Sequence, residues 1–146
     1  MNTNEIEKQL YFWIKILSMN LMRDFIRKLK KFNLTPTESI IIQKIYYDKG
    51  SSSPVSIAQC LNVSGASISK QIGKLDKKGI LIREKVPSDK RAQKIYLSQK
   101  GILLAKKMIS FQTNEENNIF SFLDTNQKKE LLETMKVASS SFKTKI

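Results

Sequence analysis

Apolar residues recur every three or four positions between Glu5 and Phe32, the spacing of one face of a helix. This stripe predicts a long first helix. A second apolar set falls partly off the same face, so the helix has more than one surface to bury. The stripe consists of Ile6, Leu10, Trp13, Leu17, Leu21, Phe25, Leu29 and Phe32.

Capping residues predict where the later helices begin. A hydroxyl or carboxylate that precedes an apolar helical pattern can accept a hydrogen bond from the first turn, and proline suits the first helical position. Helices are therefore expected from Pro36 to about Lys49, from Pro54 to Leu61, from Ser64 to Gly79, and from Ser98 through the polar residues 114–118; a re-cap at Asp124–Gln127 opens a last amphipathic helix. Residues 51–53 are expected to be a linker, with Ser53 as the cap of the helix that begins at Pro54.

A β-hairpin follows the fourth of these helices. Ile80–Val86 and Lys94–Leu97 have the composition of strands, and Pro87–Arg91 is expected to be the polar turn between them. The order helix, short helix, turn, helix, hairpin predicts a mainly α fold with a small β-hairpin wing, a winged helix-turn-helix. The second helix of such a unit lies in the major groove of DNA.

The helix after Ser64 separates into two faces at about 100° per residue. Ile68, Ile72 and Leu75 define the buried side, and the opposite side is small and cationic without a carboxylate. Small residues allow close approach to the groove, while lysine and serine can meet base edges or phosphates. The predicted DNA-binding residues of this helix are Ser64, Ala66, Ser67, Ser69, Lys70 and Lys74. The alternative is an ordinary amphipathic helix with a solvated face.

The predicted turn of the hairpin carries Asp89, Lys90 and Arg91. An arginine at a hairpin tip can enter a narrow, A·T-rich minor groove. Asp89 can hold the guanidinium of Arg91 in one orientation. The alternative is a surface turn with an incidental ion pair, which contributes little.

The charge balance favours a polyanionic partner. The 146 residues carry 26 Lys and Arg against 13 Asp and Glu, a net charge of +13. Residues 36–107 hold 14 of these cations and five of the acids, a net charge of +9, which leaves +4 for the rest. Charge concentrated on the predicted DNA-binding lobe favours nucleic acid over a uniformly lysine-rich surface.

The residue counts also exclude several kinds of chemistry. There is no histidine and one cysteine, Cys60, so a Ser-His-Asp triad, a Cys-His pair, a His/Cys zinc site and an intrachain disulfide cannot be built. We expect no metal, no cofactor and no enzymatic activity. The first residues do not resemble a signal peptide and no apolar run approaches ~20 residues, so the expected location is the cytoplasm.

From Leu34 to about Lys107 the chain resembles the MarR/SlyA family of bacterial regulators. Five segments in the same order carry this resemblance: Leu34–Glu38, Ile57–Ser64, Leu75–Leu81, Pro87–Arg91 and Tyr96–Gly101. Lys70 departs from the arginine that family members often have, and Gln71 replaces a residue that is usually apolar.

The resemblance implies an obligate homodimer on a pseudo-palindromic, A·T-rich operator, with Arg91 in the minor groove and Asp89 positioning it. It implies one domain over 1–146, with a DNA-binding lobe at 34–109 and dimerisation helices at 1–33 and 110–146. The exposed apolar face of the first helix independently favours a two-fold dimer. The recognition helices should then lie about 34–36 Å apart.

The signal that such a regulator would answer is less defined by the sequence. Trp13, Tyr46 and Tyr47 are candidates to bind a small aromatic or lipophilic effector, although core or interface packing also explains aromatics. Cys60 is a weaker candidate for sensing oxidants.

Three other readings remain open. A SarA-like regulator would read A·T-rich DNA with little base specificity. A basic amphipathic protein could bind an anionic membrane surface, but it would not need the Asp89 and Arg91 hairpin. An enzyme using Glu115 and Glu116 has no supporting motif nearby.

Overall fold

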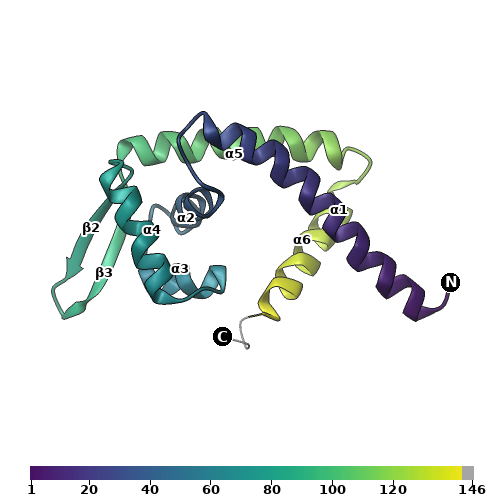
Figure 1. Ribbon diagram of the computed structural model, residues 1–146, viewed down its shortest axis with the longest axis horizontal. Coiled ribbons are helices and arrows are strands. Elements are labelled where there is room, and N and C mark those ends of the chain that lie inside the picture. The colour runs from purple at the N-terminus through teal and green to yellow at the C-terminus, as the bar shows by residue number, and fades with distance from the viewer. Residues whose placement is uncertain (143–146) are drawn as a thin grey trace. The chain divides into compact units, whose positions relative to one another are not determined.

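The computed structural model describes residues 1–142, except for the side chains of Lys90 and Arg91. The chain divides into two compact units, Met1–Pro36 and Thr37–Ile146. Helices and a hairpin in the second unit follow the order of a winged helix-turn-helix (Figure 1), which confirms the predicted fold class.

The first unit is the long helix α1, Thr3–Lys30. It begins two residues earlier than the apolar stripe predicted, because Asn2 and Glu5 form a reciprocal capping box across its first turn. Phe25 and Leu29 of the stripe are buried, whereas the stripe's N-terminal members stay exposed: Ile6, Leu10, Trp13 and Leu21. Phe12, Met19 and Ile26, from the second apolar set, are exposed as well.

Three helices build the base of the second unit: α2 (Pro36–Tyr47), α3 (Pro54–Leu61) and α4 (Gly65–Lys77). The predicted caps are confirmed, since the side chains of Ser53 and Ser64 accept hydrogen bonds from the backbone N–H groups of Ser56 and Ser67. Asn62 in the left-handed region ends α3, and Gly79 with φ 72° follows the end of α4.

The sheet differs from the expected two-stranded hairpin. Residues 51–53 were predicted as a linker, but Ser51–Ser52 form a third strand, β1, which pairs antiparallel with β3 at Ile95 and Tyr96. The strand order is β1-β3-β2. Two serines have no strand pattern of their own, so only pairing with a distant segment makes this strand.

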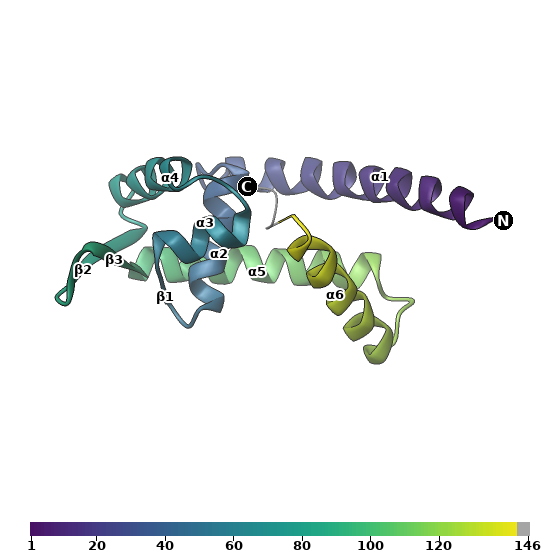
Figure 2. The same cartoon turned by 90° about the horizontal axis from the view of Figure 1, so that it is seen from below.

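The hairpin turn is also shorter than predicted. Strand β2 spans Leu81–Val86 and β3 spans Asp89–Leu97, so Pro87 and Ser88 alone form the turn. Asp89 pairs with Val86, while Gln93 pairs with Lys85, and the three residues between them bulge out of register. Both views show this hairpin projecting beyond the neighbouring helices (Figures 1 and 2).

Two further helices, α5 (Gln99–Ile119) and α6 (Thr125–Ser140), complete the second unit, and α6 turns back at an angle to α5 (Figure 2). The predicted helical state of residues 114–118 and the re-cap at Asp124 and Gln127 are confirmed. The last helix leaves Leu132, Met135 and Val137 exposed. Among the described residues, no helix is long and apolar enough to span a membrane.

The core of the second unit joins α2, α3, α4, the sheet and the first half of α5. It is almost entirely aliphatic, and its fully covered side chains include Ile41, Ile45, Ile57, Ile68, Leu75, Ile80, Ile95 and Met108. Such packing fixes α4 by its apolar side and leaves its other side at the surface.

Candidate nucleic-acid interface

Helix α4 presents the two faces that its sequence predicts. Ile68, Ile72 and Leu75 are buried. The predicted DNA-binding residues are all exposed, and the structure brings them together along one helix and its cap: Ser64, Ala66, Ser67, Ser69, Lys70 and Lys74, with Lys77 beyond them. Gln71 lies between the faces, with its side-chain oxygen buried and without a hydrogen-bond partner among the described residues.

The C-terminal end of α4 is held by polar contacts with α2 and α5. Lys78 donates to the buried Glu38 carboxylate of α2 over 2.8 Å. Lys100 Nζ donates to the backbone oxygen of Lys78 over 2.9 Å, and Ser98 Oγ lies 2.6 Å from that of Gly79. These contacts fix the direction in which the cationic face of α4 points.

The one acid of α4 is paired with the wing. Asp76 Oδ2 lies 3.2 Å from Arg83 Nε of strand β2. Helical periodicity places Asp76 off to the side of the cationic face. The sequence pattern alone gives Arg83 no role, although the alternation of β2 places Arg83 on the same side of the strand as the buried Leu81.

The tip of the wing is described only in part. Asp89 is exposed and begins β3 rather than lying within the turn. The side chains of Lys90 and Arg91 lie outside the described residues, so the roles predicted for Asp89, Lys90 and Arg91 stay predictions.

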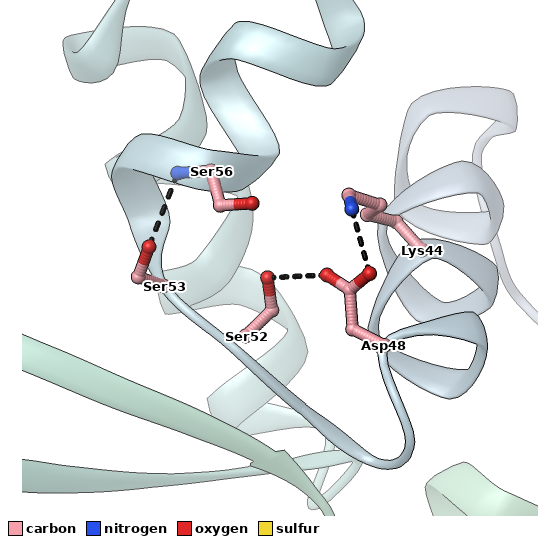
Figure 3. Close-up of polar contacts among 5 residues, drawn as sticks. All are labelled: Lys44, Asp48, Ser52, Ser53 and Ser56. Atoms are coloured by element: carbon pink, nitrogen blue, oxygen red, sulfur yellow. Dashed lines mark hydrogen bonds and ion pairs between the residues drawn. The ribbon is translucent and has the colours of Figure 1, made fainter.

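The base of the wing is fastened to α2 through Asp48 (Figure 3). Its carboxylate accepts hydrogen bonds from Lys44 Nζ over 2.7 Å and from Ser52 Oγ of β1 over 2.8 Å. Partial burial raises the pKa of Asp48, but these two hydrogen bonds and the charge of Lys44 outweigh it, so the pKa lies below its ordinary value.

This contact predicts a pH-dependent stability. The pKa of Asp48 is lower in the folded state than in the unfolded state, where it is about 3.9, so its ionised carboxylate stabilises the fold at pH values above about 3.9. This stabilisation is lost as the pH falls through the folded-state pKa. Asp48→Asn should therefore lower the free energy of unfolding by roughly 1 kcal/mol at pH 7, and the difference should shrink below about pH 4. Denaturant titrations across pH measure this difference in stability. Asp24→Asn serves as the control and should change the stability little, because Asp24 forms an exposed ion pair with Arg27 at 3.8 Å. An undiminished difference at pH 3 would contradict the argument.

The candidate sensing residues lie on three different helices. Tyr46 and Tyr47 form a T-shaped pair with ring centroids 6.2 Å apart, and Tyr47 is exposed. Trp13 lies on α1, in the other unit, with its ring against Phe12. Cys60 is exposed on α3. Within the described residues, no three Cys, Asp or Glu side chains gather to hold a metal ion.

A cationic helix supported by a three-stranded sheet defines this unit as a winged helix-turn-helix. Residues 32–92 match the family model of the MarR family. YkoM, an uncharacterized HTH-type transcriptional regulator of Bacillus subtilis (strain 168), is 27% identical over 132 residues, which cover 83% of this chain and 85% of YkoM. Over residues 32–92 the chain is therefore similar to the MarR family of transcriptional regulators.

Two further comparisons show similarity in sequence and in fold. The HTH-type transcriptional regulator MhqR of Bacillus subtilis (strain 168) is 26% identical over 110 residues, 75% of each chain. The fold is similar to the crystal structure of S. aureus MepR in DNA-binding conformation, with a TM-score of 0.81 and 20% identity over 90% of this chain and 97% of that one.

Proposed function

We propose that the protein is a homodimeric repressor that binds a pseudo-palindromic, A·T-rich operator and is released by a small-molecule or oxidant signal. The observation that carries the proposal is the exposed face of α4, where small residues and lysines stand together while the only acid of the helix is paired with Arg83. The proposal assigns no catalytic activity.

Each DNA-contacting element has a distinct role in this proposal. Lys70 and Lys74 meet base edges or phosphates in the major groove, with Ala66, Ser67 and Ser69 allowing close approach. Ser64, at the start of α4, stands where a helix N-terminus favours a phosphate. At the wing, Arg91 enters the minor groove and Asp89 orients it, with Lys90 beside them.

Dimerisation is supported by the apolar surfaces that each unit leaves uncovered. Exposed contiguous apolar faces on a soluble helix mark interaction sites. Helix α1 has such a face along its N-terminal half, and α6 has Leu132 and Met135. A second copy of the chain would bury both and place two recognition helices on one side of the duplex.

The effector is the least specified part of the proposal. Tyr46 and Tyr47 offer aromatic surface on α2, and Trp13 offers it on α1. Flat aromatic or lipophilic molecules suit such side chains. The family comparison supports a regulator, and the choice between a small molecule and oxidation at Cys60 belongs to the proposal.

The proposal predicts strong salt dependence of binding to the DNA upstream of the protein's own gene. If a dimer meets about eight phosphates, log K should fall against log salt with a slope of about −7. Lys70→Ala should weaken operator binding by about 1–3 kcal/mol, with a smaller effect on random DNA. Lys106→Ala, which removes an exposed cation from α5, serves as the control.

Fluorescence titrations with and without random competitor DNA measure these effects. A nearly flat salt dependence would argue against duplex DNA as the partner. Tighter binding to anionic liposomes than to DNA would favour the membrane-surface reading instead. Equal losses for Lys70→Ala and Lys106→Ala would mean that α4 does not carry the recognition.

A further inference from the structure

Strand β2 separates its charges between its two faces. Leu81, Arg83 and Lys85 alternate along one face, opposite Leu97, Ile95 and Gln93 of β3. Because Leu81, Ile95 and Leu97 are buried, this is the face that packs on the lobe. Glu84 points to the other face, opposite Lys94. Toward the wing tip, the inner face thus changes from apolar to cationic.

Arg83 crosses from the wing onto helix α4. Its Nε lies 3.2 Å from Asp76, and a side chain at Gly73 would place its Cβ 3.4 Å from Nη2 of Arg83. Glycine in the middle of a helix costs about 0.5–1 kcal/mol relative to alanine. Here the guanidinium lies against the surface of α4 at the glycine, where an added Cβ would only come into van der Waals contact with it.

The position of Gly73 places Arg83 beside the cationic face. Ser69 and Lys70 precede Gly73 by four and three residues and Lys77 follows it by four, so all of them share one side of the helix. The side chain of Arg83 remains 37% exposed. A guanidinium has five N–H donors in a rigid fork, and the contact with Asp76 uses the Nε edge.

We propose that Arg83 binds a DNA phosphate beside the recognition helix, in a position against Gly73 that Asp76 orients. This inference rests on the proposed DNA-binding function and adds a residue to it. An exposed ion pair alone contributes about 0–1 kcal/mol to stability. The fork of arginine matches a phosphate bidentately, which is a stronger use of the same side chain.

Salt titrations of Arg83→Gln separate a phosphate contact from a structural brace. Losing one phosphate contact per subunit should make the slope of log K against log salt less steep by about 0.9 per subunit. Affinity at fixed salt should fall about tenfold per subunit. Arg83→Lys should keep most of the slope, because the charge remains, but regain only part of the affinity.

Two matched variants isolate the contact. Lys94→Gln removes the same charge from the opposite face of the same sheet and should leave the slope close to that of the wild type. Asp76→Asn breaks the ion pair but keeps the cation, so its slope should also be retained. Melting temperatures of all variants report on the fold independently of DNA.

Three results would overturn the inference: an unchanged slope in Arg83→Gln, an equal loss in Lys94→Gln, or matching losses in Asp76→Asn and Arg83→Gln. The first two results would mean that Arg83 contributes only to the overall positive field of the protein. The third would mean that Arg83 acts as a structural brace. Failure of the proposed function would look different, because wild-type binding itself would then be weak and nearly independent of salt.

Discussion

Gly101→Ala is expected to lower the free energy of unfolding by about 1–3 kcal/mol, the usual cost of overpacking a core. Gly101 lies buried in the first turn of α5. An added Cβ would overlap the backbone oxygen of Ile80 and stand 3.2 Å from side-chain atoms of both Ile80 and Leu97. The blocked atom belongs to the backbone, so rotamer changes cannot relieve the clash.

The same contact gives the variant a second consequence. Ser98, three residues earlier, caps α5 and also contacts the backbone oxygens of Gly79 and Ile80. Displacing α5 would therefore disturb the end of α4, so operator affinity should fall together with stability. Gly65→Ala is the matched control for stability, because nothing lies within 4 Å of its added Cβ. A melting temperature unchanged in Gly101→Ala and Gly65→Ala alike would refute the packing argument.

Local chemistry explains what the sequence predicted well. A capping residue acts on backbone groups two or three positions away, so Ser53, Ser64, Ser98 and Asp124 could be assigned without knowledge of the fold. The exposed face of α4 followed from helical periodicity for the same reason. Each of these predictions depended on the residues of a single helix and its cap, and on no contact with another part of the chain.

Contacts between distant segments explain what the sequence did not predict. Strand β1 exists because Ser51 and Ser52 pair with Ile95 and Tyr96. The ion pair of Glu38 and Lys78 joins residues 40 positions apart. The position of Arg83 against Gly73 is likewise set by the fold, and the sequence of β2 alone does not predict it. In each case the residue type permits the contact, and the tertiary arrangement decides it.

Disrupting the apolar face of α1 is expected to have the largest effect on DNA binding. Ile6, Leu10 and Trp13 are 52%, 60% and 60% exposed, so together they form an apolar surface that water would otherwise cover. Leu10→Glu places a charge in its centre and should convert the proposed dimer to monomers. Two linked recognition helices gain about 100- to 10,000-fold in affinity over one, and the variant should lose that factor on the operator.

Asn4→Glu is the matched control, since it adds the same charge at an exposed position of α1 on the side away from Ile6, Leu10 and Trp13. Sedimentation velocity at micromolar concentration gives the oligomeric state, and operator titrations give the affinity. Deleting residues 1–30 should be harsher and leave an aggregating or unfolded protein, because it also removes the buried Phe25 and Leu29. A folded, soluble monomer from that deletion would contradict the role of α1, as would a wild-type monomer or a Leu10→Glu dimer that binds the operator normally.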